Sequence, residues 1–363
     1  MEKRKLTVAV LMGGKTTEHE VSLSSGRMVL KSLDRTKYTI KPITITREGQ
    51  WLIPTGYLSL QGASDGDDEM PSSQAIQPLN TGSALQRTSE EGFDVVFLAL
   101  HGAYGEDGTI QGLLELSDIP YTGSGVLASA LAMHKIRSLQ IFEQVGLSVA
   151  NYRAFDCWQW AQHREALIHE IGKELGYPCV VLPVEQGSSV GVTIAHDATQ
   201  LGDGVDRALG YGNEVLVEEY IAGEEVTCGV LGNLPGLEPT ALAPTHIIPK
   251  QTEFFDYEAK YTPGATEEVT PPRLPQEVIA AIQRVAVTAH KALGCVGLSR
   301  SDMRIRDGVV YILETNTLPG MTPTSLFPQA AAAAGITFSQ VLDRLIELAV
   351  AYHEVKRKKV TRE

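Results

Sequence analysis

Apolar residues in the first hundred positions form short runs separated by segments with helical spacing. A run over residues 6–12 is followed by apolar positions that recur at intervals of about three and four through residue 33. Runs over 38–45 and 93–100 predict two more strands, and the second is nearly continuous, as is typical of a strand covered on both faces. This order predicts a parallel α/β domain.

Two polar segments interrupt the pattern. Residues 55–91 are rich in Gly, Ser, Asp and Gln and lack periodicity, so we expect an exposed excursion there. Residues 101–108 form a glycine-rich loop directly after the third strand, at the edge where α/β sheets bind ligands. We expect helices after this loop, one around residues 113–116 and a longer one over 126–145.

The pattern changes farther along the chain. Runs at 179–184 and 190–195 flank a glycine-containing connection and predict an antiparallel hairpin, which places a domain boundary near residues 130–151. Beyond it we expect three strands, one long loop and two helices, in that order at residues 214–221, 224–232, 237–247, 245–262, 274–293 and 339–352.

Composition excludes several classes of protein. The 363 residues carry 31 Lys and Arg against 44 Asp and Glu, and a net charge of -13 disfavours a nucleic-acid partner. The four cysteines are widely spaced and form no CxxC pair, as expected of reduced residues in the cytoplasm. No stretch approaches the ~18 apolar residues of a membrane span, so we expect no membrane insertion.

Carboxylates near the C-terminus fall on two strands joined at Asp307-Gly308. A two-residue turn would place Asp302 and Glu314 on opposite faces, because side chains alternate along a strand. A three-residue loop over 306–308 pairs 305 with 309 and 302 with 312, and puts Arg300, Asp302, Glu314 and Asn316 on one face. The apolar residues at 303, 305, 309, 311 and 313 would then share the other face, which favours this register.

The resulting set of two carboxylates and an amide oxygen suits Mg2+, a cation that also takes phosphate oxygens as ligands. The alternative from spacing alone is a solvated face of ion pairs.

The motifs in chain order resemble those of D-alanine–D-alanine ligases from about residue 8 to residue 348. They are Gly13-Gly14, Glu18-His19-Glu20-Val21-Ser22, Leu100-His101-Gly102, Gly105-Glu106-Asp107-Gly108, Tyr121-Thr122-Gly123-Ser124-Gly125, Gly187-Ser188-Ser189-Val190-Gly191, Asp256-Tyr257-Glu258-Ala259-Lys260-Tyr261 and Glu314-Thr315-Asn316-Thr317-Leu318-Pro319-Gly320-Met321. Each motif is weak alone, but the ordered set is specific.

The resemblance implies an α/β protein with the ATP-grasp fold. An N-terminal parallel α/β domain at 1–132 would precede two α+β domains, at 133–223 and 224–363, that sandwich ATP. It also implies ATP-dependent ligation of two D-alanines through an acyl phosphate, for peptidoglycan precursors, by a cytoplasmic homodimer.

The resemblance also implies a role for individual residues. Two Mg2+ (or Mn2+) would be held by Asp302, Glu314 and Asn316, and ATP by Lys135, Ser189, Glu218, Glu219, Ile221 and Glu225. Arg300 and the backbone N–H of Gly320 would stabilise the tetrahedral oxyanion. Glu20 would hold the first alanine's ammonium, with His101 at the same end of the substrate. Glu20, Ser188 and Tyr261 would close the long loop over the site, and the second alanine's carboxylate would meet Lys260, Ser325 and Leu326.

Two departures from the family pattern concern cations. Leu182 stands where the family usually has a phosphate-binding lysine, and Lys135 is followed four residues on by Leu139 rather than by a second lysine. If residues 179–184 alternate as a strand, Val180, Leu182 and Val184 share a face that we expect to look toward ATP.

Two alternatives to dipeptide synthesis stay open, the first of them because of these departures. One is a catalytically impaired homologue with a binding role, and the other is a D-alanyl-D-lactate ligase, although Tyr261 favours the dipeptide form. A dinucleotide site at Gly13-Gly14 is a weak rival, because the loop lacks the GxGxxG spacing.

Overall fold

The computed structural model describes residues 4–53, 78–84, 92–249, 266–322 and 324–360. The chain divides into two compact units, and each is described by itself. Unit 1 comprises residues 1–126, 232–238 and 318–363, and unit 2 comprises residues 127–231 and 239–317. The finer division into three domains stays a prediction.

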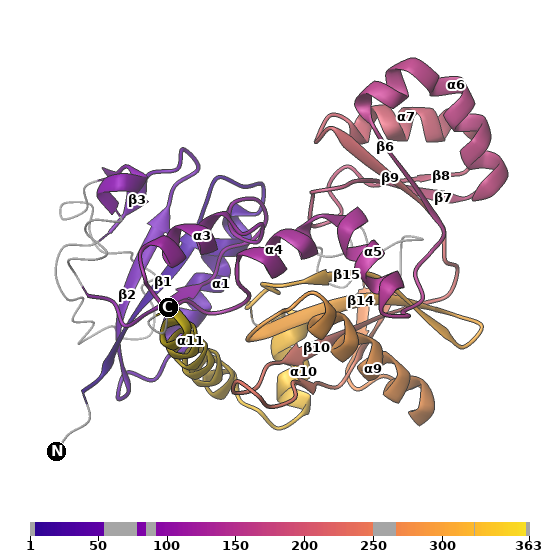
Figure 1. Ribbon diagram of the computed structural model, residues 1–363. Helices are drawn as coiled ribbons and strands as arrows, with labels where there is room; N and C mark the ends of the chain where they lie inside the picture. Colours follow the sequence, from indigo (N-terminus) through magenta and orange to yellow (C-terminus); the bar gives the residue numbers. More distant parts are fainter. Residues whose placement is uncertain (1–3, 54–77, 85–91, 250–265, 323, 361–363) are drawn as a thin grey trace. The chain divides into compact units, whose positions relative to one another are not determined.

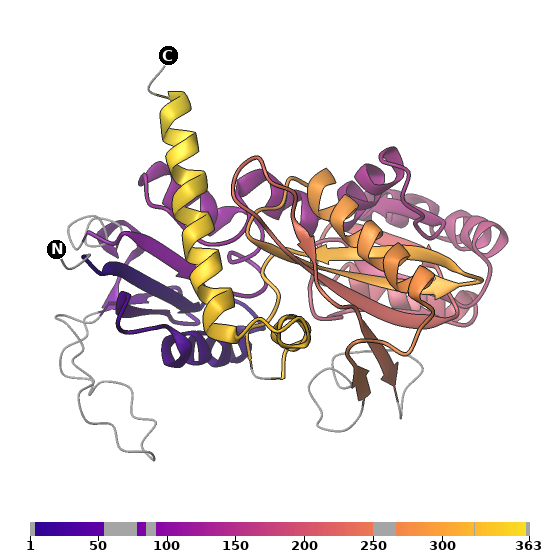
Figure 2. The ribbon, with the colours of Figure 1, turned by 90° about the horizontal axis from the view of Figure 1, so that it is seen from below.

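Unit 1 is built on a five-stranded sheet in the order β4-β3-β2-β1-β5, in which the central β1 is parallel to both β2 and β5. The helix α11 packs on α1 and β5, and Figure 2 shows it running along the sheet. The elements are β1 (Leu6–Gly13), α1 (His19–Ser32), β2 (Tyr38–Ile45), β3 (Trp51–Leu52), β4 (Pro78–Leu79), β5 (Val95–Leu98), α3 (Thr109–Leu116), α10 (Leu326–Ala333) and α11 (Phe338–Val360). The predicted parallel α/β arrangement is confirmed.

The core of unit 1 joins distant parts of the chain. Leu11, Ile43 and Leu98 come from the three parallel strands and pack with Leu114 of α3. Leu318 joins the same cluster, which ties the start of the C-terminal segment to the sheet. Most of the excursion expected at 55–91 lies outside the described residues.

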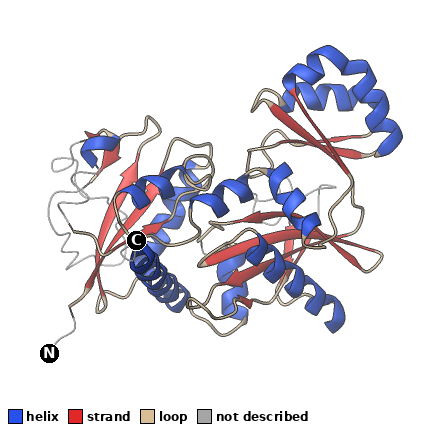
Figure 3. Cartoon of the chain, viewed as in Figure 1, coloured by secondary structure: helices blue, strands red, loops and turns tan. Residues whose placement is uncertain are grey.

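Unit 2 contains two sheets (Figure 1). The first has the order β6-β9-β7-β8, and Figure 3 shows α6 and α7 together on one of its faces. The second has the order β13-β12-β10-β14-β15, with β11 paired to β10, and it packs against α5 and α9. The elements are α4 (Val126–Met133), α5 (Lys135–Gln144), β6 (Tyr152–Asp156), α6 (Cys157–Glu174), β7 (Cys179–Pro183), β8 (Thr193–Ala195), α7 (Ala198–Ala208), β9 (Glu214–Glu219), β10 (Glu224–Leu231), β11 (Thr240–Ala241), β12 (Thr245–Pro249), β13 (Thr266–Val269), α9 (Gln276–Ala292), β14 (Leu298–Arg306) and β15 (Val309–Asn316).

Strand β7 alternates as predicted. Cys179 and Val181 are fully buried in the core beneath α6 and α7, whereas Val180 and Leu182 line a cavity on the other face. The predicted hairpin is also present, because β7 and β8 pair antiparallel with Val181 opposite Thr193.

Two sequence predictions fail where long-range contacts intervene. The helix expected over 126–145 is two helices, because His134 is extended (φ -85°, ψ 93°) and the N–H of Lys135 donates to Val184 O at 3.1 Å instead of continuing the helix. The strand expected over 237–247 is split into β11 and β12 around Pro244, which has no N–H to donate. The loop expected from residue 245 instead begins with β12, and residues 250–262 lie outside the described range.

The register of β14 and β15 differs from the prediction. Arg306 lies opposite Val309, so the turn has two residues, Asp307 and Gly308, with φ of 52° and 78°. The expected three-residue loop is therefore wrong. The apolar residues of β15 that enter the core are Val310 and Ile312, not those at 309, 311 and 313.

A β-bulge restores the predicted face all the same. The pairing shifts between Asp302 and Met303, so that Leu313 is an additional residue in β15. Beyond the bulge Asp302 lies opposite Glu314, and Arg300 lies opposite Asn316. These four residues share one face, as predicted, but they do so because of the bulge and not because of the turn.

Among the described helices, none has the length and apolar character needed to cross a membrane.

The turn between β9 and β10 has no room for a side chain at Gly223. Its φ is +149°, and a Cβ built there would lie 1.9 Å from the carbonyl oxygen of Ile305 on β14. We expect Gly223→Ala to lower the free energy of unfolding in urea by at least ~2 kcal/mol, because the turn and β14 must separate.

Gly212→Ala is the matched control, because Gly212 is exposed and a Cβ there meets nothing within 4 Å. Equal unfolding midpoints for the two variants would contradict the tight packing of this turn.

Candidate functional site

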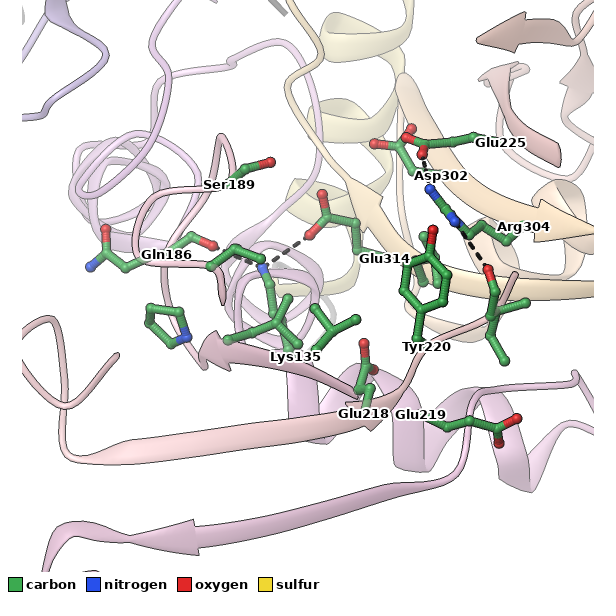
Figure 4. Close-up of a pocket in the computed structure, with 16 residues that line it drawn as sticks. Lys135, Gln186, Ser189, Glu218, Glu219, Tyr220, Glu225, Asp302, Arg304 and Glu314 are labelled. Carbon is green, nitrogen blue, oxygen red and sulfur yellow. Dashed lines mark hydrogen bonds and ion pairs between the residues drawn. The ribbon is translucent and has the colours of Figure 1, made fainter. Parts of the chain in front are cut away.

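A cavity in unit 2 lies between its two sheets and opens to solvent, with about 880 Å³ of empty space in it and at its mouth. Residues from β7, the β7–β8 connection, β9, the turn after β9, β10, β14, β15 and α5 line it (Figure 4). The structure brings together here all six residues that the sequence predicted for the nucleotide and two of the three predicted for metal, namely Lys135, Ser189, Glu218, Glu219, Ile221, Glu225, Asp302 and Glu314.

Lys135 reaches into this cavity from the first turn of α5. Its Nζ lies 2.9 Å from Glu314 Oε2 and donates to the carbonyl oxygen of Gln186 at 2.8 Å (Figure 4). The break in the helix at His134 starts α5 at this lysine, so the long-range contact that ends α4 also places the cation. Lys135 can therefore contact an anion near the β7–β8 connection.

Glu218 is a buried acid of the cavity with a strongly perturbed pKa. Burial raises its pKa from 4.5 to about 7, and the nearby Glu314 carboxylate adds to this rise while Lys135 opposes it. The neighbouring Glu219 behaves differently: burial alone would raise its pKa, but hydrogen bonds from Arg306 and Asn151 hold it below its ordinary value. Near neutral pH Glu218 can therefore donate or accept a hydrogen bond, whereas Glu219 only accepts.

Arg304 is a cavity residue that the sequence reasoning missed. Its guanidinium donates to Glu225 at 2.7 Å and to the carbonyl oxygen of Ile221 at 3.0 Å, and it lies 5.2 Å from the ring centre of Tyr220. It thus neutralises a buried carboxylate and holds the turn after β9. The alternation of residues 300, 302 and 304 along one strand indicates its position, because it places Arg304 on the same face as Asp302.

The carboxylate face lies on β14 and β15. Arg300 donates to both oxygens of Asp302 at 2.8 Å, and the hydroxyl of Thr227 on β10 donates to Asp302 Oδ1 at 2.7 Å. No cluster of three or more His, Cys, Asp or Glu arranged for a metal occurs within the described part of the chain. The set here takes its third oxygen from the amide of Asn316 instead, which is compatible with Mg2+ and leaves coordination positions for other oxygens.

The charges around the cavity constrain its ligand. Of its described lining residues, five are acidic and two, Lys135 and Arg304, are basic. Arg304 is already held by Glu225, and Lys135 by Glu314. A polyphosphate would be repelled by this surface unless cations accompanied it.

The remaining predicted residues of unit 2 lie on the β7–β8 connection and beyond the described range. Ser188 and Ser189 both have left-handed backbone conformations, with φ of 50° and 58°. Lys260 and Tyr261 lie outside the described residues.

Unit 1 carries the other predicted residues. Glu20 is exposed in the first turn of α1 and pairs with Arg47 at 2.9 Å. His101 is buried after β5. Gly320 lies in the segment that precedes α10, while Ser325 is the N-cap and Leu326 the first residue of that helix. The Ser325 hydroxyl accepts from the N–H of Thr322 at 3.0 Å.

Comparisons with known proteins agree with this architecture. Family models described as the N-terminus and the C-terminus of D-ala D-ala ligase match residues 7–124 and 141–347. The D-alanine–D-alanine ligase of Geobacillus thermodenitrificans is 42% identical over 361 residues, which are 97% of this chain and 98% of that protein.

Solved structures are also similar. The VanG D-Ala:D-Ser ligase of Enterococcus faecalis has a TM-score of 0.80 at 35% identity and covers 95% of this chain and 100% of its own. The Bacillus anthracis D-alanine–D-alanine ligase complexed with ATP has a TM-score of 0.75 at 33% identity and covers 98% of this chain and 100% of its own.

From the raised pKa of the buried Glu218 we predict that the stability of the protein depends on pH. Because folding raises its pKa from 4.5 to about 7, the folded protein keeps a proton that the unfolded chain releases. This contribution to stability is full below pH 4.5 and is lost as the pH rises through 7. Between pH 5 and 8, the free energy of unfolding should therefore fall by roughly 2 to 3 kcal/mol more in the wild type than in Glu218→Gln.

Urea denaturation across that pH range checks this expectation. Glu224→Gln, at an exposed carboxylate of β10, serves as the control and should follow the wild type. Parallel pH profiles for the wild type and Glu218→Gln would rule out a raised pKa at this position.

Proposed function

The chain belongs to the D-alanine–D-alanine ligase family and is an ATP-dependent ligase that joins D-alanine to D-alanine, and we propose how its described residues carry out the reaction. In the proposed sequence, a carboxylate oxygen of the first D-alanine attacks the γ-phosphorus of ATP and ADP leaves. The amine of the second D-alanine then attacks the acyl carbon, phosphate leaves, and the amine loses a proton. The reaction demands positioning and charge neutralisation and needs no side-chain nucleophile.

The cavity of unit 2 is the proposed ATP site, and the convergence there of all six predicted nucleotide residues carries the proposal. The adenosine would lie against residues 218–221 and Glu225. Lys135 and Ser189 would contact the phosphates. Arg304 would keep Glu225 in place for the ribose, because it binds both that carboxylate and the carbonyl of Ile221.

Asp302, Glu314 and Asn316 would hold two Mg2+ (or Mn2+). Their three side chains share one face, and the excess of acids around the cavity fits a nucleotide that arrives with divalent cations. Bound there, the cations would neutralise phosphate charge. Thr227 and Arg300 orient Asp302 for this role, because both donate hydrogen bonds to its oxygens.

The proposed substrate residues come from both units. Glu20 would hold the ammonium of the first D-alanine, with His101 at the same end. Arg300 and the N–H of Gly320 would stabilise the tetrahedral oxyanion, each worth roughly 3 to 4 kcal/mol. Ser188 and Tyr261 would link with Glu20 to exclude water, while Lys260, Ser325 and Leu326 would receive the second carboxylate.

Neither alternative is favoured. An impaired homologue and a D-alanyl-D-lactate ligase both fit less well than the dipeptide enzyme, because relatives named D-alanine–D-alanine ligase match nearly the whole chain. We also propose a cytoplasmic enzyme of peptidoglycan precursor synthesis that acts as a homodimer. The four free cysteines agree with a reducing compartment.

The proposed reaction is tested by incubating the enzyme with D-alanine and Mg-ATP, measuring ADP release and identifying the product by mass. D-alanyl-D-alanine is expected. Asp302→Asn should lower kcat at least a hundredfold, because one carboxylate of the metal set and the partner of Arg300 are lost together.

Asp307→Asn is the control for Asp302→Asn. It removes a carboxylate from the same hairpin, but Asp307 is exposed at the turn and its left-handed backbone suits asparagine. It should keep kcat within about twofold of the wild type. Similar losses in the two variants would argue against the assignment of Asp302.

Leu182 gives a second prediction, because it lines the cavity where the family usually has a lysine. Leu182→Lys should lower the Michaelis constant for ATP by up to about tenfold, the equivalent of ~1.4 kcal/mol, and leave that for D-alanine little changed. The lysine stem can keep the apolar contacts of Leu182 while its ammonium enters the cavity.

Leu182→Met, which changes shape but not charge, should leave ATP binding unaltered. If Leu182→Lys binds ATP no better than Leu182→Met, another cation already serves the phosphates.

A further inference from the structure

The segment of residues 318–321 is held from two sides by buried polar side chains of unit 1. His101 Nδ1 lies 3.0 Å from the carbonyl oxygen of Leu318, and the N–H of Met321 donates to Ser25 Oγ at 3.2 Å. Ser25 Oγ in turn lies 2.9 Å from His101 Nε2. The two ends of the segment are thus joined through one continuous chain of hydrogen bonds.

The chemistry of the partners determines which atoms donate. A carbonyl oxygen only accepts, so His101 Nδ1 carries a hydrogen. Ser25 Oγ accepts from the N–H of Met321. Toward Nε2, the Ser25 hydroxyl donates when the imidazole is neutral and accepts when it is protonated, a form that Glu106, 3.6 Å from Nδ1, favours. Both ring nitrogens of His101 are then engaged, and neither Ser25, at 0% exposed, nor His101, at 5%, has much access to solvent.

Gly320 lies inside this hydrogen-bonded segment. Leu318 precedes it by two residues and Met321 follows it directly, while Pro319 restricts the backbone between them. On a third side, a Cβ at Gly320 would lie 2.7 Å from Ser325 Oγ. The backbone of Gly320 therefore has little freedom to turn its N–H.

We propose that Ser25 and His101 are positioning residues that fix the N–H of Gly320 for the oxyanion. The inference rests on the proposed function and deepens it, because it has His101 act through the 318–321 segment in addition to its place at one end of the substrate. Ser25 belongs to none of the residues that the family motifs suggested for the reaction.

The test compares two buried serines on α1. Ser25→Ala removes the link to the 318–321 segment. Ser22→Ala is the matched control, because Ser22 is equally buried three residues earlier but binds Gly13 N at 2.8 Å and Ala99 O at 2.7 Å. Each variant of the full-length enzyme is assayed for kcat, for both Michaelis constants, and for the ratio of ADP to dipeptide.

Loss of positioning should affect the second half of the reaction. Ser25→Ala should lower kcat roughly tenfold to a hundredfold with an unchanged Michaelis constant for ATP. The ratio of ADP to dipeptide should rise above one, because slower attack by the amine leaves the acyl phosphate to water. Ser22→Ala should keep kcat within about twofold of the wild type and the ratio of ADP to dipeptide at one, even if its melting temperature falls as much as that of Ser25→Ala.

Two further variants keep the test decisive. Ser25→Cys preserves the shape and weakens the hydrogen bonds, so its kcat should be intermediate, and it decides the matter if Ser25→Ala does not fold. His101→Asn combined with Ser25→Ala should cost no more than the larger single loss, because the two residues act through one chain of hydrogen bonds.

The outcomes separate this inference from the function on which it rests. Absence of D-alanyl-D-alanine from the wild-type reaction would contradict both. If the wild type makes the dipeptide but Ser25→Ala and Ser22→Ala lose kcat equally, only the positioning role is contradicted. The same holds if Ser25→Cys keeps full activity and a ratio of ADP to dipeptide of one.

Discussion

The pairing of β14 with β10 and β15 decides which side chains of unit 2 face its core and which face its cavity. With a two-residue turn and no bulge, Asp302 and Glu314 would point to opposite sides of the sheet. The additional residue at Leu313 reverses the alternation of β15 halfway along. One hairpin therefore buries Met303 and Ile312 in the core at one end and presents two opposed carboxylates at the other.

The concentration of acids that results has to be stabilised within the protein. Each buried or half-buried carboxylate of the cavity is matched by a cation or by a proton. Arg300 binds Asp302, Arg304 binds Glu225, and Lys135 binds Glu314. Glu218, which has no such ion pair of its own, has a pKa raised to about 7 by burial. A surface prepared in this way suits a ligand that brings positive charge with it.

In unit 1, serine hydroxyls on α1 hold backbone segments near the ends of β1 and β5. Ser22 of α1 accepts from the N–H of Gly13, the last residue of β1, and donates to the carbonyl oxygen of Ala99, directly after β5. Ser25 extends the same arrangement to residues 318–321, far along the chain. Such contacts fix backbone direction without adding charge, which is what an N–H donor to an oxyanion requires.

Hydrophobic periodicity by itself determined much of this protein. It located β2 at its observed bounds and predicted both the parallel arrangement of the N-terminal strands and the alternation of β7 that turns Leu182 to the cavity. These features depend on neighbours two to four residues apart, which a sequence displays directly. The shared face of Asp302 and Glu314 was also predicted, although through the wrong turn.

Only the tertiary structure decided the features that depend on distant partners. Val184 accepts the N–H of Lys135 and so divides one predicted helix into two, and the paired strand β14 supplies Arg304 to Glu225. The pKa of Glu218 likewise depends on burial by elements far along the chain. The spacing of residues along the sequence does not reveal such contacts, because the free energy that stabilises them is gained only when the sheets and helices pack.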